Sequence, residues 1–215
     1  MRRRFLKYGL VILFAFFLIP VKVVVPSGAS NGKKIFNDRK CSDCHSTEKT
    51  AFNDKGPALW YAGSKFKGDF LKKWLANPLP IRAAAYRSVT ETNPGGHPGV
   101  AGGEAMEVAR YLMGLKAKDV PSAAIKPGTS SIARALFEKK GGCYGCHRIT
   151  KGEYTVGGLS GPSLENAGMR LNADWIYAYL KNSRFFDPNG RMPVFSGFLS
   201  DEEMKALAGY VSAQE

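Results

Sequence analysis

Hydrophobic residues follow two different patterns along this chain of 215 residues. Fourteen consecutive residues from Tyr8 to Val21 carry no charge and form an apolar run. Beyond residue 30, apolar residues recur at spacings of three and four, and no segment alternates with period two. The first pattern is typical of an export signal or a membrane anchor, and the second is typical of amphipathic helices. We therefore expect an N-terminal hydrophobic helix followed by an all-α fold.

The N-terminal run has the features of an export signal. Four cations in residues 2–7 precede it, and the small residues Ser27 and Ala29 stand where a signal peptidase would cleave. The run is short for a transmembrane helix, which needs about 17–25 residues, but Lys22 at its end is able to snorkel to the membrane surface. We expect residues 1–29 to be a signal peptide or a membrane anchor, with residues 5–25 in contact with the membrane. Both alternatives place the remaining chain in the periplasm or at the outer face of the cytoplasmic membrane.

Positive charge is concentrated in that same segment. The chain has 31 Lys and Arg against 18 Asp and Glu, a net charge of +13, and five of the cations lie within residues 1–29. The remainder has no basic stripe interleaved with aromatic residues, so we expect no nucleic-acid partner. Seven lysines of the first repeat described below form either a docking surface for an acidic partner or simply solvated helix faces. They are Lys33, Lys34, Lys40, Lys65, Lys67, Lys72 and Lys73.

The chain beyond residue 30 contains one order of features twice. An amphipathic helix with an aromatic residue is followed by C-x-x-C-H, by G-P-x-L, by a second helix and by a final helix with a tyrosine. The corresponding pairs are Phe36 and Phe137, Cys41 and Cys143, Gly56 and Gly161, Asp69 and Asp174, and Tyr111 and Tyr210. Such self-similarity predicts two copies of one domain. We expect them at residues 30–115 and 130–215, joined by a linker at 116–129 that is rich in proline and small residues.

The two C-x-x-C-H motifs predict covalent haem attachment. They consist of Cys41, Cys44 and His45, and of Cys143, Cys146 and His147. Cysteines three apart lie on one face of a helical turn, so both thiols can reach two vinyl groups on one edge of a porphyrin, and the histidine can ligate the iron. A thiol redox pair needs no such histidine, and a zinc site needs cysteine pairs about 15–20 residues apart. We therefore expect two covalently bound haem c groups.

On these motifs the chain resembles two fused class I c-type cytochrome domains, each similar to a small monohaem cytochrome c. The resemblance covers residues 31–115 and 130–215. It implies two tandem helical domains, each wrapped around one covalent haem. It also implies that the first and last helices of each domain cross at an aromatic contact, between Phe36 and Tyr111 and between Phe137 and Tyr210.

The resemblance further implies a sixth iron ligand in the loop before the last helix, usually a methionine followed by proline. The second copy has Met192 at that place, and Ser200 and Glu203 then form a capping box for the last helix. Met169 falls too early for this role, and Met204 falls within the helix. We therefore expect Met192 to be the sixth ligand of the second haem.

The first copy departs from that pattern. Its loop contains no methionine but has His97 before a proline, and His97 is the only histidine outside a C-x-x-C-H motif. We expect His97 to be the sixth ligand, with Met106 in the last helix as the alternative; without either, the first iron would be open to small ligands. The loop is about ten residues longer than its counterpart, and the sequence indicates no purpose for residues 78–87.

Two saturated haems imply an electron carrier rather than an enzyme. A methionine ligand raises haem potential relative to a second histidine, so we expect electrons to pass from the first haem to the second, between a redox protein donor and an acceptor. An alternative is the cytochrome subunit of a membrane oxidoreductase, such as a quinol-oxidising bc-type complex of a respiratory chain. A dihaem peroxidase, a longer kind of chain with one open iron, is a third interpretation.

Overall fold

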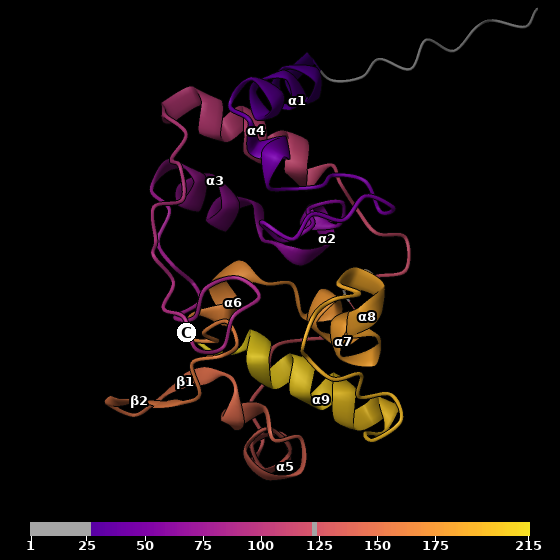
Figure 1. Ribbon diagram of the computed structural model, residues 1–215. Helices are drawn as coiled ribbons and strands as arrows, with labels where there is room; N and C mark the ends of the chain where they lie inside the picture. Colours follow the sequence, from indigo (N-terminus) through magenta and orange to yellow (C-terminus); the bar gives the residue numbers. More distant parts are fainter. Residues whose placement is uncertain (1–26, 122–123) are drawn as a thin grey trace, which may run out of the picture.

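A computed structural model describes residues 27–121 and 124–215 (Figure 1). The expected signal peptide or anchor falls almost entirely outside these residues. The first described helix, α1 (Ser27–Asp38), includes the expected cleavage region. Within the described ranges, none of the helices combines the length and apolar character that crossing a bilayer requires.

The first half, residues 27–115, is helical. After α1 come a 3-10 turn η1 (Cys41–Asp43), α2 (Ala62–Lys65), α3 (Gly68–Ala76) and α4 (Gly102–Met113). Each longer helix is amphipathic, and the buried positions of α3 and α4 are those that the spacing of three and four predicts. Its buried core includes Phe36, Leu71, Val108 and Leu112.

The second half, residues 130–215, repeats this order with additions. It consists of α5 (Ser131–Ala135), a π-helical turn η2 (Leu136–Lys140), a 3-10 turn η3 (Cys143–Gly145), β1 (Arg148–Lys151), β2 (Tyr154–Gly157), α6 (Ala167–Arg170), α7 (Ala173–Lys181), α8 (Ser183–Phe186) and α9 (Asp201–Ser212). The expected capping box between Ser200 and Glu203 is confirmed. It supplies partners for backbone N–H groups that the first turn of α9 leaves free.

The antiparallel hairpin β1–β2 corrects the all-α prediction. Arg148 pairs with Gly157 and Lys151 with Tyr154. Only Gly152 and Glu153 separate the strands, and Gly152 has a φ of 63°, which a glycine adopts without steric cost. The strands have four residues each, and only Ile149 is buried, so they are too short to give a clear period-two pattern.

The first and last helices of each half pack together through the expected aromatic pairs. The ring centroids of Phe36 and Tyr111 are 5.8 Å apart, and those of Phe137 and Tyr210 are 5.6 Å apart. A Cβ atom on Gly32 would overlap the carbonyl oxygen of Glu107, so only glycine permits the close approach of α1 to α4. Ala133 occupies the corresponding place on α5 and is buried.

The two halves meet through the same segment of each. The amide of Lys67 donates to the carbonyl of Arg170 at 3.0 Å, and the amide of Asn172 donates to the carbonyl of Lys65 at 2.9 Å. Phe66 and Leu171 form an antiparallel bridge between these bonds. Residues 65–67 and 170–172 are 105 positions apart, which is also the offset of the G-P-x-L motifs. The contact is therefore isologous, as at a two-fold axis.

The long loop after α3 makes a second contact between the halves (Figure 1). Residues 81–88 of this loop, here called the crossing segment, reach the second half. The amide of Ser163 donates to the carbonyl of Ile81 at 2.8 Å, and Arg82 forms a bridge with Pro162. Arg87 binds the carboxylate of Asp187 through both terminal nitrogens, at 2.8 and 3.1 Å. This segment includes most of residues 78–87, to which the sequence assigned no purpose.

The connection between the halves is packed rather than loose. Ala117 is buried, and its amide donates to the Ser64 hydroxyl at 2.9 Å. The amides of Ala124 and Ile125 donate to the buried carboxylate of Asp174 at 3.2 and 2.8 Å. The linker predicted at residues 116–129 is thus attached to both halves at defined points.

Candidate haem sites

Both C-x-x-C-H motifs adopt the same backbone turn. The residue before the first cysteine is left-handed in each, with φ of 56° at Lys40 and 62° at Gly142. The histidine amide then donates to the carbonyl of the first cysteine at 2.9 Å in both motifs. This turn brings the two cysteines and the histidine of each motif together at one place.

A proline carbonyl fixes the orientation of each motif histidine. Nδ1 lies 2.8 Å from the carbonyl oxygen of Pro57 in His45 and of Pro162 in His147. A carbonyl only accepts, so Nδ1 carries the proton and Nε2 keeps its lone pair for a metal. A hydrogen bond from the ring nitrogen that does not bind the metal orients a ligating histidine. These prolines belong to the G-P-x-L motifs, which the sequence showed as repeats without indicating this role.

The glycine of each G-P-x-L motif makes room for the ring. A Cβ atom on Gly56 would come within 2.8 Å of His45 Cε1, and one on Gly161 within 2.7 Å of His147 Cε1. Real side chains do not tolerate such distances. The repeated Gly-Pro pair therefore has two functions, since glycine allows close approach and proline provides the acceptor.

Burial sets the ionisation of these groups. It lowers the pKa of His45 and of His147, so both rings are neutral near pH 7 and available as ligands. It raises the pKa of the Cys41 thiol, and that of the Cys143 thiol to about 11. Thiols with raised pKa values are poor redox nucleophiles, so the pairs do not resemble thiol–disulfide exchange centres.

His97 lies opposite His45. Their ring centroids are 5.9 Å apart, with 43° between the ring planes. His97 Nδ1 lies 3.0 Å from the carbonyl oxygen of Pro98, and the Trp74 ring packs against the histidine at 4.7 Å. Nε2 of His97 is therefore also free of the proton. The structure brings together the two histidines that the sequence predicts as axial ligands, whereas Met106 lies on α4 and is 40% exposed.

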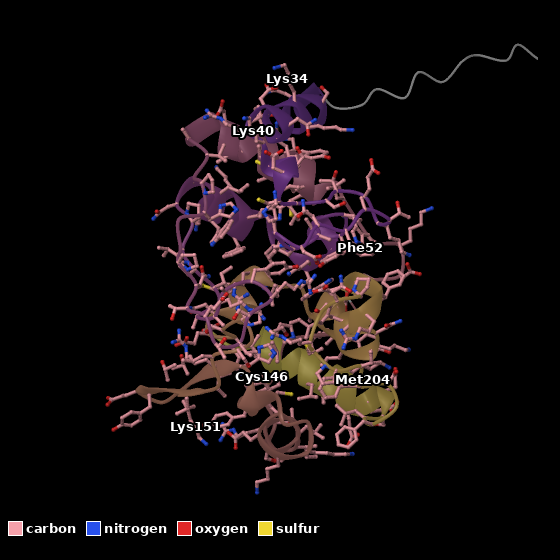
Figure 2. The ribbon with its side chains drawn as sticks, viewed as in Figure 1. Lys34, Lys40, Phe52, Cys146, Lys151 and Met204 are labelled. Atoms are coloured by element: carbon pink, nitrogen blue, oxygen red, sulfur yellow. The ribbon has the colours of Figure 1, made fainter. Side chains whose placement is uncertain are left out.

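In the second half, Met192 lies in the loop between α8 and α9. It is half-buried against the core, and the hydroxyl of buried Ser183 donates to its carbonyl at 2.8 Å. Met204 is buried within α9 (Figure 2), and Met169 is 60% exposed on α6. Met192 is therefore the methionine that is both held in place and in the predicted loop. Its role as a ligand stays a prediction.

These donor sets fit a covalently attached porphyrin iron. In each half, two thiols one turn apart adjoin a neutral imidazole whose Nε2 has no hydrogen-bond partner among residues 27–121 and 124–215. Cys41 and Cys143 pack against the hydrophobic cores, so an apolar macrocycle would meet apolar surface there. His97 and Met192 would complete the coordination.

Comparison with known proteins bears on the second half. Residues 131–211 match the family described as cytochrome c oxidase, cbb3-type, subunit III. This part of the chain is similar to a c-type cytochrome domain. Domains of this kind carry covalent haem, transfer electrons and typically lie outside the cytoplasm. The match covers less than half of the chain, and no curated protein and no solved structure matches it.

Proposed function

We propose that this protein is a dihaem electron carrier with one covalently bound haem in each half, residues 30–115 and 130–215. The observation that carries the proposal is the shared geometry of the two motifs. The Nδ1 atom of each motif histidine lies 2.8 Å from a proline carbonyl oxygen. Each ring lies against a glycine at a place where a Cβ atom would not fit. Each histidine also follows two cysteines and a left-handed residue before them. A match to a cytochrome domain in one half therefore supports the same assignment in the other.

The residues of the two halves have parallel roles with one difference. Cys41 and Cys44, or Cys143 and Cys146, would hold a haem through thioether bonds, and His45 or His147 would ligate its iron. His97 in the first half and Met192 in the second would complete the coordination. The haems supply one-electron redox chemistry. Since a methionine ligand raises haem potential relative to histidine, the ligand set of the first half would give the lower potential and that of the second half the higher. Electrons would then pass from the first site to the second.

Mass spectrometry and spectroelectrochemistry test this proposal together. The full chain is expressed in a host that attaches haem c and is purified from the periplasmic and membrane fractions. We expect a mass increase of two haems and two separate redox transitions, with a methionine-type spectrum in the high-potential one only. Retention of residues 1–29 is read from the same mass. Colourless protein, or protein of unmodified mass, would contradict the proposal.

Carbon monoxide tests the coordination of the first iron. If His97 and His45 both ligate it, the reduced protein binds carbon monoxide slowly or not at all. Rapid binding, together with turnover of peroxide, would instead indicate an open iron and the peroxidase interpretation.

A second candidate is the cytochrome subunit of a membrane oxidoreductase complex. The match of residues 131–211 to a family named as an oxidase subunit favours it over a free carrier. Mild solubilisation of native membranes, followed by affinity capture of the tagged chain, distinguishes the two. Stoichiometric co-purification of integral membrane subunits identifies a complex, whereas recovery of the chain alone from the soluble fraction identifies a free carrier.

A further inference from the structure

Cations gather where the two halves meet, and side-chain nitrogens are seen there in Figure 2. Five contribute: Lys65 and the crossing-segment residues Arg82 and Arg87 from the first half, and Arg170 and Arg191 from the second. Asp187 neutralises Arg87. Within residues 27–121 and 124–215, no carboxylate lies within ion-pair distance of Lys65, Arg82, Arg170 or Arg191.

Burial makes this excess of positive charge unfavourable by itself. Arg170 is 6% exposed, and its guanidinium donates to a neutral carbonyl, that of Ser163. Burial lowers the pKa of Arg170 to about 10 and that of Lys65 to about 8. Buried charges are normally paired because their desolvation is costly. The cluster therefore needs an anion that the described side chains do not supply.

Unpaired N–H groups at the same boundary point to the same conclusion. Nε of Arg82 and Nε1 of Trp175 are buried, and neither has an acceptor in the part of the chain that the structure describes. Trp175 is 7% exposed, and the Lys65 ammonium lies 4.8 Å from its ring centre. Buried donors without partners are rare in folded proteins. A ligand with several acceptor oxygens has the groups that these donors and cations lack.

Arg82 and Arg170 both contact the G-P-x-L motif of the second half, residues 161–164. Arg82 bridges to Pro162, whose carbonyl holds His147, and its terminal nitrogen donates to the carbonyl of Ser160 at 2.9 Å. The Arg170 guanidinium donates to the carbonyl of Ser163, the next residue of the same motif, so both arginines contact the segment that holds His147. Arg82 is supplied by the first half, however.

We propose that Arg82 completes the cofactor site of the second half across the boundary by binding a porphyrin carboxylate together with Arg170. This inference rests on the proposed function. A haem carries two propionate carboxylates on the edge opposite its thioether bonds, and these groups have the charge and acceptor oxygens that the cluster lacks. Arginine suits a carboxylate because its N–H groups form a planar fork. The crossing segment thereby has a purpose, since it delivers one ligand-binding residue of the neighbouring site.

Substitution of Arg82 tests the proposal in the haem-loaded full chain. Arg82→Gln keeps a donor for Ser160 but removes the charge, which stabilises the oxidised second haem. We expect the oxidised-to-reduced ratio of that haem at fixed potential to rise about tenfold, equivalent to ~59 mV, with a smaller change in the first haem. Arg82→Lys restores most of the potential because it keeps the charge. Arg134→Gln, at an exposed arginine of α5, is the control and leaves both potentials unchanged.

Three results overturn the inference while leaving the proposed function intact. The first is a second-haem potential that is the same in Arg82→Gln as in wild-type protein carrying two haems. The second is a shift confined to the first haem. The third is a wild-type second potential that follows added citrate at constant ionic strength, because a free anion would then occupy the cluster. Wild-type protein without haem would instead contradict the proposed function itself.

A vibrational measurement covers the case in which Arg82→Gln does not mature. Redox-difference infrared spectra of Arg82→Lys report propionate bands directly. We expect a shifted carboxylate band relative to wild type, because a single ammonium replaces the guanidinium fork. An unchanged band would overturn the inference.

Discussion

The two halves of the molecule hold their motif histidines alike but differ on the opposite side of each site. In the first half an exposed loop brings His97 to within 5.9 Å of His45, measured between ring centroids. In the second, the Met192 loop is tied to the core through the buried hydroxyl of Ser183. The motif side is fixed by local hydrogen bonds that recur in both copies, whereas the opposite side is free to change. If both sites hold haem as proposed, this difference between His97 and Met192 would give the two halves different redox potentials.

The largest expected effect comes from making the halves chemically equal. His97→Met should raise the potential of the first haem by more than ~59 mV, which is over tenfold in its oxidised-to-reduced ratio, because a thioether replaces an imidazole. Spectroelectrochemical titration measures both transitions, and they should move closer together. Met106→Leu is the matched control and should leave them separate. If Met106→Leu rather than His97→Met changed the first transition, the ligand assignment would be wrong.

The next prediction concerns the packing where α1 crosses α4. Gly32→Ala forces a Cβ atom against the Glu107 carbonyl, so overpacking should cost about 1–3 kcal/mol of unfolding free energy. Urea denaturation followed by circular dichroism measures it. Gly103→Ala on the same pair of helices is the control, because a Cβ atom there meets nothing within 4 Å. The reverse change in the second half, Ala133→Gly, should cost about 1 kcal/mol. If Gly32→Ala cost no unfolding free energy, the first crossing would accommodate a Cβ atom as the second crossing already does, and the expected difference between them would be wrong.

The smallest expected effect concerns the last helices. The N-cap of α4 is Ala101, without a side-chain hydrogen bond, whereas α9 begins with Asp201, which pairs with Lys205 at 2.6 Å. Hydrogen bonds from Lys205 and Tyr177 hold the pKa of Asp201 at about 2, below its ordinary value. Its contribution is therefore complete above about pH 4 and is lost as the pH falls towards 2.

Melting temperatures of wild type and Asp201→Asn across this pH range check the sign. Wild type should be the more stable protein at pH 7, and the difference should disappear near pH 2. Glu202→Gln, a neighbouring exposed carboxylate, is the control and should show a flatter difference. A gap that widens on acidification would contradict the assigned interactions.

Features that depend on a few neighbouring residues could be predicted from the sequence. The capping box of Ser200 follows from residue types at fixed places on a helix, and the pairing of Phe137 with Tyr210 follows from the resemblance to c-type cytochrome domains. Both are present. The position of His97 opposite His45 also agrees with its place in the loop before the last helix. The metal-binding roles of these histidines remain predictions.

Features that depend on the partner half could not be predicted. Nothing in residues 81–88 indicates a contact, because the acceptors of Arg82 and Arg87 lie in residues about 80 and 100 positions away. The hairpin was missed for a different reason. Its strands have four residues each, and its strongest signal, Gly152 at the first position of a two-residue loop, is local turn chemistry rather than periodicity. The role of the Gly-Pro pairs could not be predicted either, because it depends on where the histidine ring lies in the folded chain.

The isologous contact of residues 65–67 with residues 170–172 has a consequence for how the boundary tolerates substitution. Its two hydrogen bonds join backbone groups only, so most substitutions there would change the side chains without removing a donor or an acceptor. Proline in place of Lys67 or Asn172 is the exception, because it has no N–H to donate.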